Sequence, residues 1–122
     1  MTEIFIDPTK SSIAIQITSQ SLHALGFEIT VFASDGATVI EQFQGDTKTD
    51  NPFTQKIQDK PSNYKDTYIR GTFTVISPDG KDYLYSILFS VLEDNVIISP
   101  DINLTGITKG GQDTTLANFH TN

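Results

Sequence analysis

Alternating apolar and polar residues mark two long strands in the middle of the chain. Residues 68–76 read YIRGTFTVI, residues 83–92 read YLYSILFSVL, and the tripeptide Pro78-Asp79-Gly80 between them is typical of a turn. A three-residue loop here predicts a β-hairpin. Its register pairs Val75 with Tyr83, Phe73 with Tyr85, Gly71 with Ile87 and Ile69 with Phe89. Because every residue in these pairs except Gly71 is apolar or aromatic, this face is predicted to be core.

Gly71 lies among bulky residues in the middle of the first of these strands. Glycine normally weakens a strand, so we predict a close contact that a side chain would block, or a bulge. The alternative is an open space filled by Phe73 and Ile87.

Three further stretches alternate in the same way, at residues 13–17, 26–33 and 38–43. The dipeptide Asp35-Gly36 joins the last two and is a strong turn signal. The predicted second hairpin sets Val31 opposite Val39, Ile29 opposite Glu41 and Phe27 opposite Phe43.

Shorter candidate strands complete the pattern, at residues 3–6, 54–58, 96–98 and 102–107. No stretch has helical periodicity, and turn residues recur roughly every 8–12 positions. The sequence therefore predicts one all-β domain over residues 1–122. Its fold is an antiparallel β-sandwich of about 7–9 short strands, immunoglobulin-like or a related Greek key.

Two segments carry weaker patterns. Residues 44–67 contain glycine, prolines and several charges, and a loop of this length is either functional or hides a strand. The candidate strand is 54–58, with Phe53 and Ile57 turned inward. The polar tail, 112–122, is either a last edge strand or disordered.

Composition and charge exclude several functions. The chain has 122 residues, a formal net charge of −7 and no cysteine, which rules out disulfides and thiolate chemistry. The negative charge disfavours binding to nucleic acid and to anionic membrane surfaces. No secretory signal and no apolar run long enough for membrane insertion is visible, so we expect a cytoplasmic protein. A leader that had been removed would leave the same pattern.

The sequence does not predict an enzyme. Its two histidines, His23 and His120, lie beside no nucleophile motif, and both are expected at the surface. Glu28 and Glu41 have opposite parity in the second hairpin, so they cannot line one cleft as a catalytic pair.

Acidic residues in the predicted loops suggest calcium as a cofactor. Calcium prefers six to eight oxygen ligands gathered from flexible loops. The candidate ligands are Asp46, Asp50, Asn51, Asp94 and Asp101, accompanied by Glu93, Asn95 and Asn103. The alternative is that these residues only form turns, in which Asp and Asn are common.

Aromatic residues and arginine provide the candidate binding residues. Tyr68 and Arg70 alternate with the core residues of their strand, while Phe53 and Tyr64 fall in the 44–67 segment. Tyrosine and arginine are common anchors of binding surfaces. The sequence therefore predicts a non-catalytic binding module that recognises a protein or carbohydrate partner.

Two alternatives stay open. The first is a calcium-dependent ligand-binding domain. The second is a structural subunit of a larger assembly, joined through an exposed strand edge or through Leu84, Leu88 and Leu92, which share the second face of their strand. Either the 44–67 segment or a second copy of the chain is expected to cover these leucines.

Overall fold

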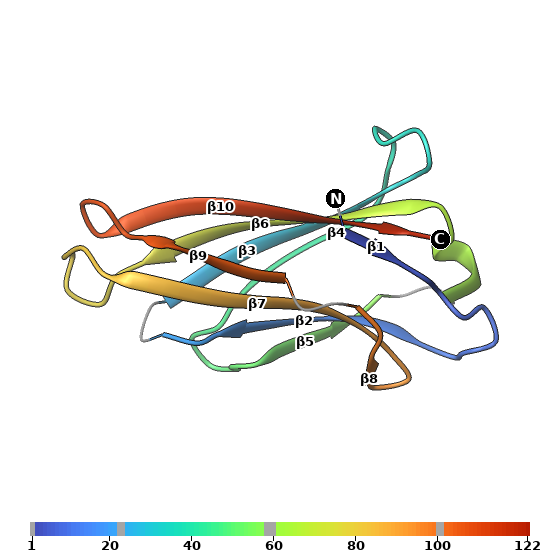
Figure 1. The fold of residues 1–122 in the computed structure, drawn as a ribbon, viewed down its shortest axis with the longest axis horizontal. Coiled ribbons are helices and arrows are strands. Elements are labelled where there is room, and N and C mark those ends of the chain that lie inside the picture. The colour runs from blue at the N-terminus through green and yellow to red at the C-terminus, as the bar shows by residue number, and fades with distance from the viewer. Residues whose placement is uncertain (1, 22–23, 58–60, 100–101) are drawn as a thin grey trace.

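The protein is an all-β sandwich of two sheets (Figure 1). The structure is a computed structural model that describes residues 2–21, 24–57, 61–99 and 102–122. Within these ranges the chain forms ten strands and one short 3₁₀ helix, η1 (Pro61–Tyr64). The all-β class predicted from the sequence is confirmed, with one strand more than expected.

Each sheet contains five strands. Sheet A has the spatial order β1 (Thr2–Ile4), β10 (Gln112–Thr121), β6 (Thr67–Ile76), β3 (Ala24–Phe32) and β4 (Val39–Asp46). Sheet B has the order β5 (Phe53–Lys56), β2 (Ile13–Ser19), β7 (Leu84–Glu93) and β8 (Val96–Ile97), with β9 (Ile102–Ile107) also paired to β7. All pairs are antiparallel except β1 and β10, which run parallel.

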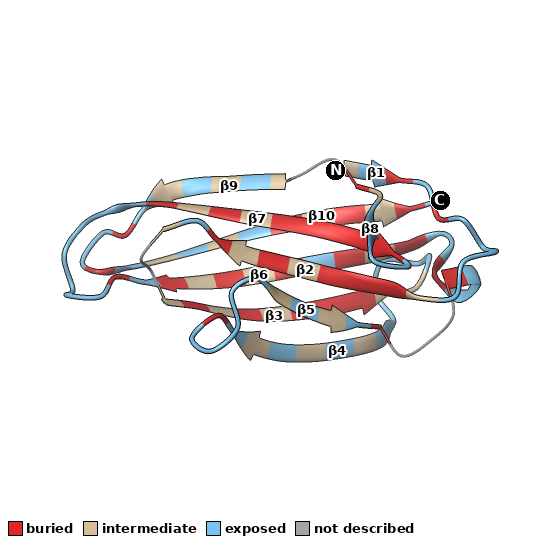
Figure 2. Ribbon diagram, turned by 90° about the horizontal axis from the view of Figure 1, so that it is seen from below, coloured by how far each residue is buried: buried red, intermediate tan, exposed pale blue. Residues whose placement is uncertain are grey.

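The core fills the space between the sheets, where every second residue of the central strands points inward (Figure 2). Phe73 from sheet A and Phe89 from sheet B are both 0% exposed, and their rings contact edge-on with centroids 5.5 Å apart. Phe119 packs on Phe89 at 4.9 Å. Aromatic contacts between the sheets thus hold the two layers together.

The predicted hairpin between residues 68–76 and 83–92 is wrong. These segments form β6 and β7, which belong to different sheets and pair with other strands. Phe73 therefore faces Phe89 across the core instead of pairing with Tyr85. The backbone beyond β6 bonds elsewhere, because the Ser77 N–H donates to the Gly111 carbonyl at 2.8 Å.

The inward-facing residues of both strands were nevertheless predicted correctly, with one exception. Ile69, Phe73, Tyr85 and the others are buried, because hydrophobic alternation specifies the face of a strand whichever neighbour it pairs with. The exception is Tyr83, which is 42% exposed and donates a 2.7 Å hydrogen bond to Asp79.

The second predicted hairpin exists, but its register is shifted by two residues. Ile29 lies opposite Phe43 and Val31 opposite Glu41, with an irregularity between Val31 and Phe32. The loop is longer than predicted because the Asp35 carboxylate accepts hydrogen bonds from the Ala37 and Thr38 N–H groups. These bonds stabilise a wider turn than a three-residue loop.

The 44–67 segment does contain a strand. β5 pairs with β2, and beside it Ile57 is buried at 4% exposure, as predicted. The polar tail is also ordered as a strand, because β10 pairs with β6 along its whole length. Among the residues that the structure describes, no helix has the length and apolar character needed to cross a membrane.

Candidate functional site

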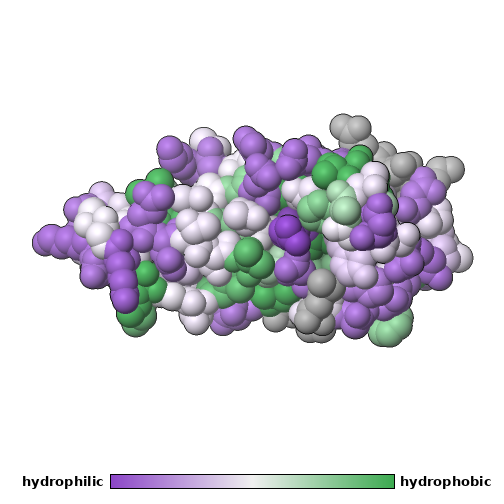
Figure 3. Space-filling view, turned by 90° about the horizontal axis from the view of Figure 1, so that it is seen from above, coloured by the Kyte–Doolittle hydropathy of each residue, from purple (hydrophilic) through white to green (hydrophobic). Residues whose placement is uncertain are grey.

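The outer face of sheet A carries aligned rows of polar side chains. Register places Thr72 of β6, Glu28 of β3 and Gln44 of β4 in one row across the strands. The next row consists of Thr74, Gly26 and Asp46. Seen from above, this side of the molecule is mostly hydrophilic with separate apolar patches (Figure 3).

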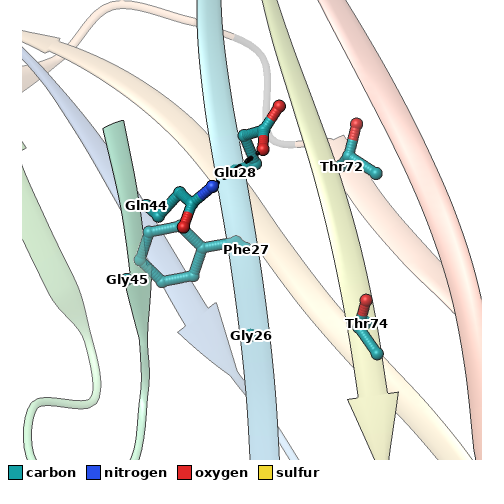
Figure 4. A pocket seen from close by; sticks show the side chains of 7 residues that line it. All are labelled: Gly26, Phe27, Glu28, Gln44, Gly45, Thr72 and Thr74. Atoms are coloured by element: carbon teal, nitrogen blue, oxygen red, sulfur yellow. Dashed lines mark hydrogen bonds between the residues drawn. The ribbon is translucent and has the colours of Figure 1, made fainter. Parts of the chain in front are cut away.

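A concavity of about 400 Å³ lies between these two rows. Its lining combines polar side chains, two glycines and one aromatic ring: Gly26, Phe27, Glu28, Gln44, Gly45, Thr72 and Thr74 (Figure 4). Gly26 causes the hollow, because a β-carbon added there would meet nothing within 4 Å. At Gly45 the Phe27 ring occupies the space that a side chain would need.

Glu28 organises the polar wall of the concavity. Its carboxylate accepts hydrogen bonds from Gln42 Nε2 at 2.8 Å and from Gln44 Nε2 at 3.0 Å. Gln42 Nε2 also donates to Thr30 Oγ1 at 3.2 Å. Because both amide nitrogens turn toward Glu28, the amide oxygens are left as hydrogen-bond acceptors.

Farther along the same face, Arg70 and Tyr68 are held by their neighbours. Arg70 Nε donates to Asn118 Oδ1 at 3.0 Å, and the guanidinium carbon lies 5.1 Å from the centre of the Phe32 ring. Tyr68 stacks on His120 with ring centroids 4.6 Å apart. Arg70 is exposed and Tyr68 is partly buried, so both predicted residues do lie on this face.

His120 bridges two carboxylates, which the sequence did not suggest. Its Nδ1 lies 2.7 Å from Glu3 Oε2 and its Nε2 lies 2.9 Å from Asp66 Oδ1. The hydrogen bond with Asp66, followed by that with Glu3, raises the pKa of His120 above its usual 6.5. This bridge ties β1 and the turn before β6 to β10.

The other two candidate binding residues lie on the inside. Tyr64 is 1% exposed and donates a 2.9 Å hydrogen bond to Glu41. Phe53 is partly buried against Phe27, with ring centroids 4.8 Å apart. Neither ring is placed on the outer face of sheet A with Tyr68 and Arg70.

The candidate calcium ligands are spread along the molecule. Asn51 bonds to the backbone of Ser19 at one end of β2, whereas Asp94 bonds to Ser11 and Ser12 just before its other end. A strand of this length separates them by about 20 Å. Across the described ranges, no three His, Cys, Asp or Glu side chains are grouped to hold a metal ion.

Of the remaining acidic residues of that set, Asp46 and Glu93 accept backbone hydrogen bonds. Asp46 accepts a hydrogen bond from the Lys48 N–H at 2.9 Å, and the Asp7 N–H donates to Glu93 at 3.0 Å. Asp50 is exposed, and Asp101 lies outside the described residues, as does His23.

The three leucines of β7 differ in their exposure. Leu84 is 76% exposed beside Ile107, which is 45% exposed, whereas Leu92 is only 6% exposed. The 44–67 segment does not cover Leu84, because β5 lies at the edge of sheet B beyond β2.

No protein-family model, curated protein or solved structure matches this chain. Glu28, Gln44, Thr72 and Thr74 were missed because each is an ordinary outward-facing strand residue, whereas Phe27 points into the core at 5% exposure. The sequence does carry a signal for this surface. Glu28 and Thr30 are polar residues two positions apart, as are Gln42 and Gln44, so each pair lies on one face of its strand.

Proposed function

We propose that the protein is a non-catalytic binding module that recognises a neutral, hydroxyl-rich ligand, a glycan, through the concavity on sheet A. The observation that carries this proposal is the Glu28 network, which holds both glutamine amides in one orientation. The Glu28 carboxylate and the Gln44 amide oxygen, both in the lining, are then available to the ligand as acceptors. Sugar hydroxyl groups are matching donors.

The charge of the chain supports the same ligand class. A net charge of −7 repels anionic ligands, while a neutral glycan pays no such penalty. Among the described residues that line the concavity, only Glu28 carries a carboxylate. Because glycoside hydrolysis ordinarily needs two, the concavity is suited to binding without cleavage.

The finer fold assignment, an immunoglobulin-like or related Greek-key connectivity, stays a prediction. Its support is that the chain passes repeatedly between two sheets and that the last strand, β10, lies between β1 and β6.

A glycan array of neutral oligosaccharides tests the function. Binding to one class is expected, and Gln44→Ala should weaken it about 2- to 10-fold, the value of one hydrogen bond. Gly26→Val should fill the concavity and abolish binding. The matched control is Gln16→Ala, on the outer face of sheet B, which should bind as wild type.

Two results would contradict the proposal. One is an array without any bound neutral glycan. The other is binding that Gly26→Val leaves unchanged, which would move the site elsewhere. A third outcome is specific binding to a protein partner, abolished by Gly26→Val. The concavity would then still be the binding site, but its ligand would be a protein and not a glycan.

A further inference from the structure

We propose that the open edge of β10 pairs with the same edge of a second copy of this chain, antiparallel about a two-fold axis at Thr115. This inference is independent of the proposed function. It concerns the side of sheet A that carries β1 and β10, not the concavity.

β10 is paired on one side only over most of its length. β6 pairs with it from Gln112 to Thr121, whereas β1 pairs only with Phe119 to Thr121. At Gln112 the N–H donates to the Lys109 carbonyl in an isolated bridge, so, among the described residues, 113–118 form the open edge of the sheet. An edge strand exposes unpaired backbone groups that can bind another strand.

Hydrogen bonds at the end of β10 show which residues point toward this edge. The Asn122 N–H donates to the Ile4 carbonyl, and the Asn122 carbonyl accepts from the Ile6 N–H, so residue 122 faces the β1 side. The Thr121 carbonyl instead accepts from Asp66 on the β6 side. The backbone N–H and C=O groups of successive residues point to opposite sides of a strand. Thr114, Leu116 and Asn118 therefore present theirs at the open edge.

This edge lacks the features that normally prevent strand pairing. Residues 113–118 contain no lysine, arginine or proline, and their register with β6 is continuous. The one charged residue, Asp113, points inward and accepts a 2.6 Å hydrogen bond from Tyr85. By contrast, β4 at the opposite edge pairs irregularly with β3, and β5 is four residues long and ends in Lys56.

The edge is complementary to itself. With Thr115 on the two-fold axis, Thr114 lies opposite Leu116 of the partner subunit, and Asp113 lies opposite Ala117 of the partner subunit. No like charges meet, and Leu116, which is 56% exposed, gains Leu116 of the partner subunit as a diagonal neighbour on the same face. These matches favour a second copy of the chain, and not an unrelated peptide, as the strand that pairs with the open edge of β10.

Sedimentation velocity between about 10 and 500 µM tests the pairing. A monomer–dimer equilibrium is expected, weak because one strand edge buries little area, and stronger at higher salt because two acidic copies repel. Leu116→Pro should remove the dimer without unfolding, since the lost N–H points to the open edge and not to β6. Leu116→Ala keeps that N–H and should retain measurable dimer.

The absence of native cysteine allows the register to be tested directly. Directly opposed residues in a non-hydrogen-bonded antiparallel pair have Cα atoms about 4.5 Å apart, which suits a disulfide. Thr115→Cys should therefore form a covalent dimer under mild oxidation, and Thr114→Cys should not.

Three results would overturn the inference. They are a monomer at all concentrations, a dimer that folded Leu116→Pro leaves intact, and cross-linking through position 114 in place of 115. A folded Leu116→Pro variant is recognised by an unchanged amide NMR spectrum for strands other than β10.

Discussion

A side chain at Gly71 in β6 should destabilise the protein, whereas one at Gly26 in the neighbouring β3 should not. A β-carbon at Gly71 would lie 2.7 Å from Phe73 Cζ, 2.8 Å from Phe73 Cε2 and 3.1 Å from Phe89 Cε1. Carbon atoms in contact are normally about 3.5–4.0 Å apart, so the Phe73 ring would have to move by about 1 Å. The close contact predicted from the sequence is thereby confirmed.

The cost of this movement follows from where Phe73 lies. The ring is 0% exposed and contacts Phe89, so it cannot turn toward solvent. Overpacking of this kind costs about 1–3 kcal/mol, and replacing a strand glycine returns roughly 0.5–1 kcal/mol. Gly71→Ala should therefore lower the free energy of unfolding by about 1–2 kcal/mol.

Gly26→Ala is the matched control, because it makes the same chemical change on the outer face, where the added carbon meets nothing. It should leave stability unchanged or raise it by up to about 1 kcal/mol. Urea denaturation measures both variants, and with a slope of about 2 kcal/mol/M their midpoints should differ by about 1 M. A Gly71→Ala midpoint at or above that of wild type would refute the packing described around Phe73.

Other positions give further predictions. Phe73→Ala should lower the free energy of unfolding by about 3–5 kcal/mol. In double-mutant cycles the coupling energy of Phe73 with Phe89 should be about 0.5–1.5 kcal/mol, and that with Tyr85 should be smaller. A β6–β7 hairpin would require the reverse. His120 has a raised pKa, so the stability it adds is complete below pH about 6.5 and is lost as pH rises through the folded-state pKa. The wild type should thus exceed His120→Gln in stability by more at pH 6 than at pH 9, and an equal difference at both would contradict the bridge. Calcium at about 10 mM should not shift the melting temperature, whereas a rise that Asp50→Asn reduces would restore the calcium site.

Sequence patterns predicted the faces of the strands better than their partners. Ile69, Phe73 and Val75 point inward as expected, because burial of alternate residues depends only on local periodicity. The pairing of β6 with β10 and β3 depends on backbone groups that every residue carries. Two segments with one apolar face each can lie side by side in one sheet or face each other across a core, and their sequences do not distinguish these arrangements.

The same reasoning explains which site residues were predicted. Tyr68 and Arg70 were placed on the outer face by alternation, whereas Tyr64 follows a segment without periodicity, so its burial had no local signal. The bridge joins His120 to Glu3, which is 117 positions away in the chain, and to Asp66, which is 54 positions away. Contacts at such separations are set by topology, which alternation does not determine.

The two proposals combine into a prediction about avidity. Pairing at β10 about an axis perpendicular to the sheet would place the outer faces of both copies on the same side. Counting five strand spacings from β3 to its copy, the two concavities would lie about 24 Å apart on one continuous surface. A ligand displayed repeatedly on a support could then occupy both, and the second contact would benefit from a high effective concentration.

Surface-bound glycan at two densities separates this effect from the affinity of a single site. Leu116→Pro should match wild type at low density, because the concavity is unchanged, and should dissociate at least about 10-fold faster at high density. Gly26→Val should lose binding at both densities. Equal behaviour of wild type and Leu116→Pro at high density would show that pairing at β10 contributes nothing to recognition, even if the dimer forms.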